Sequence, residues 1–147
     1  MTAHLPPTAR SLPIALIRAR EGVMGPIRAM LAETGLSEQQ WRVLRVLSEH
    51  GALDTTTLAD RASLLHPSLT RMLASMRKRG LVTQTRSQQD KRRQIVEITK
   101  AGRQVIDDNT AEATAIVAQY QKALGRERYE MLLDLLAQLD PGPRSTS

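Results

Sequence analysis

The spacing of apolar residues along the chain follows a helical period at first and then changes briefly to the period of a strand. Between residues 12 and 31, apolar side chains recur at nearly helical intervals, which predicts a first helix. Pro26 lies inside this segment and has no N–H to donate to the carbonyl of Gly22. We therefore expect one kinked helix here rather than two separate helices.

Three more helices are expected before the apolar spacing changes. Ser37 opens the second helix, and Gln40 stands three residues later as its partner in a capping box. Thr55 or Thr56 is expected to cap a short third helix, and a proline, Pro67, suits the first position of the fourth. The fourth helix has a buried stripe at the spacing i, i+3, i+4 and i+7, formed by Leu69, Met72, Leu73 and Met76.

A change of period marks a small β-hairpin after the fourth helix. Residues 81–86 and 94–99 alternate and are rich in β-favouring side chains, so they predict two strands joined by a seven-residue connection. A long helix over 100–124 and a strongly amphipathic helix over 126–140 complete the pattern. The expected fold class is mainly α with a small β-hairpin (α+β), in the order α-α-α-α-β-β-α-α.

The amino-acid composition excludes or disfavours several classes of function. Among the 147 residues there are one Trp, two Tyr and no Phe, so the core is aliphatic and single-strand nucleic-acid binding by base stacking is disfavoured. No cysteine is present, which excludes disulfides and thiolate chemistry. No apolar run is long enough for a membrane span, and the N-terminus has no apolar signal region. We therefore expect a cytoplasmic protein with no membrane partner.

Positive charge is concentrated in one part of the chain. Residues 71–100 hold nine cations and two acids, a net charge of +7, whereas the remainder holds twelve cations and thirteen acids. A short helix, a basic helix and a hairpin in succession predict a winged helix-turn-helix unit that binds double-stranded DNA. Arg71 is the candidate guanine reader, because a guanidinium can bond O6 and N7 together. The candidates for DNA contact before the tip of the hairpin are Ser68, Thr70, Arg71, Ser75, Arg77 and Arg86.

Two other function classes compete with this interpretation. An enzyme is disfavoured because the chain has no Walker loop, G-x-S-x-G or H-E-x-x-H motif, and its histidines, His4, His50 and His66, lack metal-ligand spacing. Neither a cofactor nor a metal is therefore expected. A sequence-neutral architectural DNA binder is an alternative, and it would bind all duplexes with one affinity and a steep salt dependence.

The segment from Trp41 to Gly102 resembles the MarR family of bacterial winged-helix regulators. The family's recognition helix and first wing strand are similar to PSLTRMLASMRKRGLV, and its hallmark is similar to DKRRQIVEITKAG. The hallmark positions are Asp90, Arg92, Thr99 and Gly102. The resemblance covers about residues 11–140. Within the family, the stretches LIRAREGVM and GLSEQQWRVLRVLSE resemble the regulators of homoprotocatechuate-degradation operons. Those regulators repress aromatic-acid catabolism genes.

The resemblance implies a homodimer on a pseudo-palindromic operator. Residues 12–34 and 100–140 would form the dimerisation helices, and residues 37–99 the winged DNA-binding domain. The Leu-rich face of the last helix and the apolar first helix are compatible with such an interface. Two recognition helices would then lie about 34 Å apart, which is one turn of DNA.

The resemblance also implies roles for the charged residues in the stretch SQQDKRRQ (87–94) at the tip of the wing. Arg92 would enter the minor groove, where narrow A·T-rich tracts concentrate negative potential, and Asp90 would orient it. Lys91 and Arg93 would contact phosphates, which gives affinity without sequence information. The alternative is a solvated run of charges with no defined geometry.

Regulators of this family usually respond to small aromatic acids bound between the dimerisation helices and the winged domain, so the resemblance implies an effector site. Arg18 and Arg20 are two residues apart on the first helix, so at most one should face inward to meet a carboxylate. We favour Arg20, with Glu21 as an acceptor for a ligand hydroxyl. The expected ligand-binding residues are Arg18, Arg20, Glu21, Trp41, Arg42 and His66.

Several of these residues also have a purely structural interpretation. Trp41 can belong to the core, His66 can be a turn residue hydrogen-bonded to the backbone, and either arginine of the first helix can pair with a glutamate across the dimer. The function we expect is a repressor of aromatic-acid catabolism genes, released by a small phenolic or catecholic carboxylate. The alternative within the family is a regulator of efflux or stress genes with a different ligand.

Overall fold

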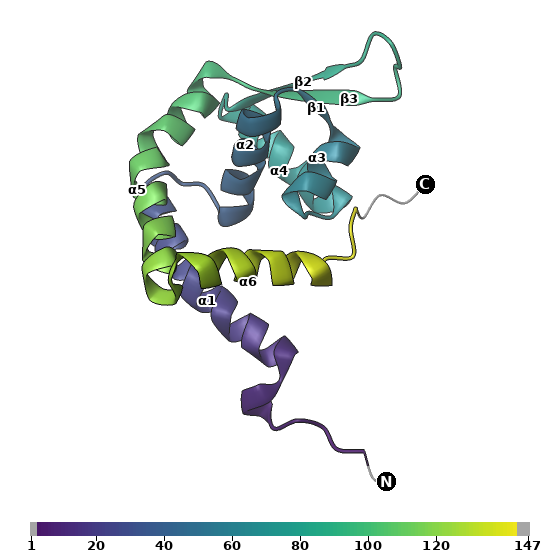
Figure 1. The fold of residues 1–147 in the computed structure, drawn as a ribbon. Helices are drawn as coiled ribbons and strands as arrows, with labels where there is room; N and C mark the ends of the chain where they lie inside the picture. Colours follow the sequence, from purple (N-terminus) through teal and green to yellow (C-terminus); the bar gives the residue numbers. More distant parts are fainter. Residues whose placement is uncertain (1–2, 144–147) are drawn as a thin grey trace.

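The computed structural model describes residues 3–143, and most of these residues lie in helices (Figure 1). In chain order the elements are η1 (Thr8–Arg10, a 3-10 turn), α1 (Leu12–Leu31), α2 (Glu38–His50), β1 (Leu53–Asp54), α3 (Thr55–Ala62), α4 (His66–Lys78), β2 (Val82–Arg86), β3 (Gln94–Ile98), α5 (Lys100–Leu124) and α6 (Arg126–Leu139). The fold is mainly α with a small antiparallel sheet, as the sequence predicts. No helix within residues 3–143 is long and apolar enough to cross a membrane.

The sheet contains one strand more than the predicted hairpin. β2 and β3 pair antiparallel, from Val82 opposite Ile98 to Arg86 opposite Gln94. The two-residue β1 pairs with the other edge of β3, so that the strand order is β1-β3-β2. Two residues cannot show an alternating pattern, and for this reason the sequence did not predict β1.

The cap of α3 differs from the prediction. Asp54 is the N-cap, rather than Thr55 or Thr56, and its Oδ1 accepts a hydrogen bond of 2.7 Å from the N–H of Thr57. Asp is among the strongest N-cap residues, because its carboxylate accepts from an otherwise unpaired N–H. The same residue ends β1, so a single side chain joins the sheet to the start of α3.

Three prolines lie within helices: Pro13 and Pro26 in α1, and Pro67 in α4. α1 continues through Pro26 as one helix, as the sequence predicts. α4 begins at His66, so Pro67 is its second residue and not its first, which corrects the predicted start by one position. Pro67 removes no helical hydrogen bond, because the first four N–H groups of a helix have no partner within it.

The winged unit is built around an aliphatic core. α2, α3 and α4 contribute their apolar faces, and the sheet covers one end of them (Figure 1). The stripe predicted for α4 is buried, except that Met72 is only partly so. The buried residues of this core are Leu36, Val43, Leu44, Leu47, Leu58, Ala59, Ala62, Leu64, Leu69, Leu73, Met76, Leu81, Val82 and Val96.

A second, smaller cluster joins the winged unit to α1 and α5. Its buried members are Met30 and Leu31 of α1, Trp41 of α2 and Ile116 of α5. The hydroxyl of Tyr120 on α5 also donates a hydrogen bond of 2.6 Å to the carbonyl oxygen of Val23 on α1. A displacement of α5 would therefore be transmitted to both α1 and α2.

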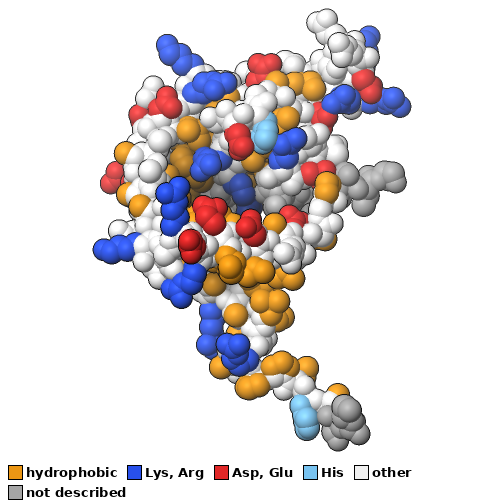
Figure 2. Space-filling model, viewed as in Figure 1, with side chains coloured by type: hydrophobic (Ala, Val, Ile, Leu, Met, Phe, Trp, Pro, Cys, Tyr) orange, Lys and Arg blue, Asp and Glu red, His pale blue; other side chains and the backbone are white. Residues whose placement is uncertain are grey.

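The helices near the two ends of the chain expose apolar side chains. α6 has no buried residue, and the N-terminal half of α1 extends away from the winged unit (Figure 1). Figure 2 shows hydrophobic side chains gathered over these helices. The large exposed ones are Leu12, Leu16, Ile17 and Val23 of α1, and Met131, Leu132, Leu133, Leu135, Leu136 and Leu139 of α6. Apolar surface of this kind is typical of an interface with another chain.

The start of α5 approaches the wing so closely that it requires glycine. Thr99 caps α5, and its Oγ1 accepts from the N–H of Gly102 at 3.1 Å and donates to the carbonyl of Gly80 at 2.6 Å. A Cβ on Gly102 would overlap the carbonyl oxygen of Leu81 and lie 2.7 Å from Cγ1 of Ile98. These contacts explain the Thr-x-x-Gly pattern: the threonine closes the helix end, and the glycine allows the close packing.

Gly102→Ala is expected to lower the free energy of unfolding by about 1–3 kcal/mol, because the added methyl group must displace a backbone carbonyl and a core side chain. Gly22→Ala is the matched control: nothing lies within 4 Å of its added Cβ. Alanine at that helical position should stabilise the protein by about 0.5–1 kcal/mol. Urea denaturation followed by circular dichroism measures both. Equal stability of Gly102→Ala and the wild type would contradict the tight packing.

Candidate nucleic-acid interface and adjoining cavity

The solvent-facing side of α4 carries the residues predicted to read DNA. Because Leu69, Leu73 and Met76 are buried in the core, the opposite face of the helix points outward. On that face Thr70, Arg71, Ser75 and Arg77 are exposed, and Ser68 is half-buried. α4 can therefore present polar side chains to a DNA groove while it keeps its core contacts.

Arg71 and Arg77 differ in what they contact. Arg71 has no ion-pair partner within residues 3–143, so its guanidinium is available to a base or a phosphate. Arg77 donates a hydrogen bond to the side-chain oxygen of Gln84 on β2. This contact ties the end of α4 to the first strand of the wing.

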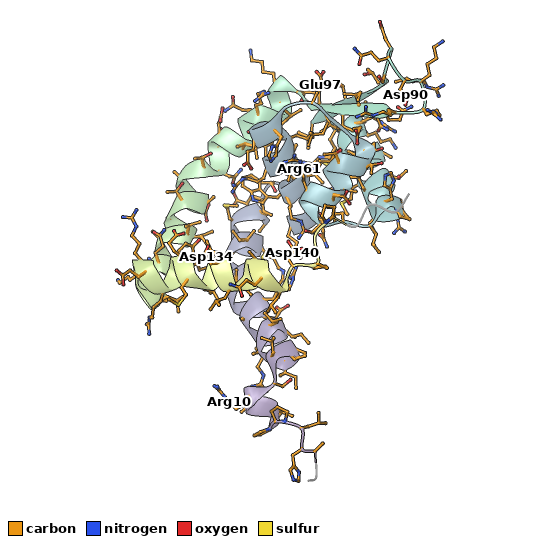
Figure 3. The ribbon with its side chains drawn as sticks, turned by 45° about the vertical axis from the view of Figure 1, so that its right-hand side comes forward. Arg10, Arg61, Asp90, Glu97, Asp134 and Asp140 are labelled. Carbon is orange, nitrogen blue, oxygen red and sulfur yellow. The ribbon has the colours of Figure 1, made fainter. Side chains whose placement is uncertain are left out.

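Hydrogen bonds order the tip of the wing. The hydroxyl oxygen of Ser87 accepts from the N–H of Gln89 at 3.3 Å and from that of Asp90 at 3.2 Å. The N–H of Ser87 donates to the carbonyl of Arg93 at 2.8 Å, and the N–H of Arg93 donates to the carbonyl of Asp90 at 2.9 Å. Figure 3 shows Asp90 at the far end of the hairpin. The connection is a turn of defined geometry, which argues against a solvated run of charges.

Asp90 and Arg92 form an ion pair at this tip. Oδ1 of Asp90 accepts from the backbone N–H of Arg92 at 3.1 Å and from its Nε at 3.2 Å. The side chain of Arg92 is 92% exposed, so the rest of its guanidinium faces solvent. Lys91 and Arg86 are also exposed and have no ion-pair partner in the described part of the chain.

Arg93 points the other way, toward the end of β1 and the start of α3. Its guanidinium pairs with Oδ2 of Asp54, the N-cap of α3. Burial acts to raise the pKa of Asp54, but the hydrogen bonds from Thr57 and Arg93 outweigh it, so this pKa lies below its ordinary value. Arg93 therefore has different surroundings from Lys91 and Arg92, although the three cations are adjacent in the sequence.

A cavity of about 410 Å³ lies between α2 and α5. Its lining residues are Trp41, Arg45, Ile106, Thr110, Ala113, Thr114 and Val117. Trp41 was predicted for the effector site, and it belongs to the buried core as well. Sequence reasoning missed Arg45, the one cation in this lining. The available signal was its place four residues after Trp41, which puts both on one face of a helix.

Two of the residues predicted for the effector site are engaged in ion pairs within the chain. Arg20 pairs with Glu38 of α2 at 2.6 Å, and Arg28 pairs with Glu21 at 3.0 Å. The hydrogen bond from Arg28 holds the pKa of Glu21 below its ordinary value. Neither Arg20 nor Glu21 lines the cavity beside Trp41. The glutamate partner foreseen for an arginine of α1 is therefore present for Arg20, within the same chain.

The remaining predicted effector residues are spread over three helices. Arg18 is exposed on α1, and Arg42 is half-buried on α2. Nε2 of His66 lies 3.4 Å from Oγ1 of Thr56, so this histidine bridges the starts of α3 and α4. None of these residues lines the cavity between α2 and α5. Within residues 3–143, no group of three or more acidic, histidine or cysteine side chains could hold a metal ion.

Comparison with known proteins decides the family. Residues 36–93 match the model of the MarR family. The HTH-type transcriptional regulator FarR of Neisseria gonorrhoeae is 38% identical over 129 residues, which cover 88% of each chain. This chain belongs to the MarR family. Another relative is the homoprotocatechuate degradative operon repressor of Escherichia coli, which is 35% identical over 126 residues, 86% of this chain and 85% of the repressor.

Solved structures of MarR-type proteins have the same fold. NadR in complex with 4-hydroxyphenylacetate has a TM-score of 0.81 and 36% identity, over 95% of this chain and 97% of NadR. The transcriptional repressor CouR bound to a 23-mer DNA duplex has a TM-score of 0.82 and 28% identity, over 95% of this chain and 99% of CouR. This MarR-family protein is accordingly a transcriptional regulator with a winged helix-turn-helix fold.

Arg92→Ala is expected to weaken binding to the operator more than Lys91→Ala does. Arg92 is held at the wing tip by Asp90, whereas Lys91 has no such partner. Loss of an oriented base-edge or groove contact should cost about 1–3 kcal/mol, and loss of a phosphate contact less. Fluorescence anisotropy with labelled operator DNA measures both constants. Equal losses would mean that the tip contributes only charge.

Proposed function

We propose that this MarR-family regulator is a repressor of aromatic-acid catabolism genes, which binds a pseudo-palindromic operator as a homodimer and is released by a small phenolic or catecholic carboxylate. One observation carries the proposal. The winged unit exposes unpaired cations on α4 and the wing, and a cavity containing a single cation lies directly between that unit and α5. DNA contact and effector binding are therefore connected through a shared element, α2.

The DNA-binding part of the proposal rests on charge and shape. Arg71 on α4 and Arg92 at the wing tip are exposed, and they come from two elements that can enter different grooves of one duplex. Lys91 and Arg86 would contact phosphates. The structure of CouR on a DNA duplex supports a similar use of this fold.

The homodimer part rests on the exposed apolar faces of α1 and α6. A helix with no buried residue, such as α6, gains little stability from its own chain. Association of two copies through these helices would remove the exposed leucines from water. A two-fold dimer would also place two copies of α4 on one side of the duplex, about one turn apart.

The effector part rests on the lining of the cavity between α2 and α5. Trp41, Ile106 and Val117 offer an apolar wall for an aromatic ring, and Arg45 offers a cation for a carboxylate. The hydroxyls of Thr110 and Thr114 can bond a phenolic oxygen. The volume of about 410 Å³ is sufficient for a ligand of this size. NadR, which binds 4-hydroxyphenylacetate, supports the choice of ligand class.

Release of DNA would follow from the position of this cavity. α2 packs in the core of the winged unit, and α5 packs against α1 through Tyr120 and Ile116. A ligand that fits best when α2 and α5 lie at a different angle would move the two recognition helices of a dimer relative to each other. A coupling of about 1–3 kcal/mol would weaken operator binding 5- to 150-fold.

Gel-shift competition with the promoter region of the regulator's own gene tests sequence-specific binding. Operator DNA is expected to bind about 10³-fold or more tightly than random duplex, because base-edge contacts add to the phosphate contacts. A duplex with one half-site should bind far more weakly than one with two, since a dimer then loses half its contacts. Equal competition by random DNA would favour the sequence-neutral alternative.

Arg45→Gln is expected to weaken the binding of 4-hydroxyphenylacetate and 3,4-dihydroxyphenylacetate by about 10- to 100-fold, because a charge-assisted hydrogen bond to the carboxylate is lost. Isothermal titration calorimetry measures the constants. Arg103→Gln, at an exposed position of α5 outside the cavity lining, is the matched control.

Arg20→Ala completes this series, because Arg20 was the cation favoured from the sequence and is paired with Glu38. Unchanged affinity in Arg20→Ala together with a loss in Arg45→Gln places the carboxylate at Arg45. The reverse result would place it at Arg20 and contradict the cavity assignment.

A further inference from the structure

Two adjacent arginines of the wing have opposite surroundings. The side chain of Arg92 is 92% exposed at the tip, and its partner Asp90 is half-buried. The side chain of Arg93 is 55% exposed and pairs with Asp54, which is only 14% exposed. Asp54 does not belong to the wing: it lies at the junction of β1 and α3, 39 residues earlier in the chain.

Asp54 holds three parts of the winged unit together. Its backbone pairs with Ile95 of β3, its Oδ1 accepts from the N–H of Thr57 at the start of α3, and its Oδ2 accepts from Arg93. α3 in turn packs on α4, and the Thr56–His66 contact links their starts. The Arg93–Asp54 pair therefore connects the tip-side end of β3 to the helices that present α4.

We propose that Arg93 is a positioning residue, which fixes the wing relative to the recognition helix through Asp54 and does not contact a phosphate. The inference rests on the proposed DNA-binding function. It replaces the role that the resemblance implied for Arg93 and leaves that of Lys91 unchanged.

Electrostatics favours this arrangement in the DNA complex as well. If Arg93 turned toward a phosphate, the carboxylate of Asp54 would keep only its hydrogen bonds with Thr57. That carboxylate is mostly shielded from water, and it would then face the negative potential of the duplex without a cation. Lys91, at the exposed tip, can reach a phosphate without breaking any ion pair.

The consequence is geometric. Arg92 reads one groove from the wing tip, and Arg71 reads another from α4, so operator recognition needs a fixed spacing between the wing and the helix. Without the Arg93–Asp54 pair the hairpin can pivot about its base, and the two arginines no longer fit their sites at the same time. Binding to random DNA does not need such a match, so it loses less affinity than binding to the operator.

The salt dependence of binding distinguishes a positioning residue from a phosphate contact. Each phosphate contact contributes a slope of about one to the plot of log K against log salt. The experiment measures the affinity of the full-length protein for operator and random duplex at several salt concentrations. The variants are Arg93→Ala, Arg93→Lys, Asp54→Asn and Lys91→Ala, and circular dichroism checks that each is folded.

Lys91→Ala is the control for a phosphate contact. It should reduce the slope by about one and weaken operator and random DNA alike. Arg93→Ala should leave the slope unchanged, because no phosphate contact is lost, and operator affinity should fall by about three- to tenfold more than the affinity for random DNA, as expected for a partly exposed ion pair. Arg93→Lys keeps a cation facing Asp54 and should retain most of the operator preference.

Asp54→Asn gives an independent outcome, because Asn caps helices as well as Asp does. Loss of the carboxylate frees Arg93, so binding to random DNA should strengthen while the preference for the operator falls. Two results would overturn the inference: a slope in Arg93→Ala as shallow as that in Lys91→Ala, or an unchanged operator preference in both Arg93→Ala and Asp54→Asn. A wild type that does not distinguish operator from random DNA contradicts the proposed function instead.

Discussion

The packing of α4 into the aliphatic core is the interaction on which the rest of the winged unit depends. Leu69, Leu73 and Met76 are buried, so the helix has only one rotation about its axis that keeps them from water. That rotation places Arg71 and its polar neighbours on the outside. The DNA-facing surface is therefore a consequence of core packing, and it needs no polar contact of its own to hold it in place.

The same core also fixes the position of the wing. Val82 and Val96 belong to the cluster that buries α4, so the hairpin starts from a fixed base. Thr99 then closes the start of α5, and Gly102 lets that helix approach the wing without a Cβ between them. α5 leaves the winged unit in a defined direction and meets α1 and Trp41 in the second cluster. The cavity between α2 and α5 lies along this path, which is why we propose that a ligand bound there affects DNA binding.

Hydrogen bonds and an ion pair divide the basic residues into different roles. The cations are concentrated in the second half of the winged unit, but the net charge alone does not say which of them face DNA. Arg77 is bonded to Gln84, Arg93 to Asp54, and Arg79 donates to the carbonyl oxygens of Thr34 and Gly35 at 2.7 and 3.2 Å. These arginines hold elements of the fold together, whereas Arg71, Lys91 and Arg92 remain available to contact DNA.

The sequence by itself determined the six helices, the two strands of the hairpin and their order, because helical and strand periods are local properties that neighbouring residues specify. It also identified the family and the wing-tip pair of Asp90 and Arg92, which are two residues apart. Only the tertiary structure decided the partners that come from distant segments: β1 beside β3, Asp54 beneath Arg93, Glu38 against Arg20, and the cavity that brings Arg45 and Trp41 to α5. These contacts depend on how packed helices and strands lie in space, and no spacing along the chain encodes that arrangement.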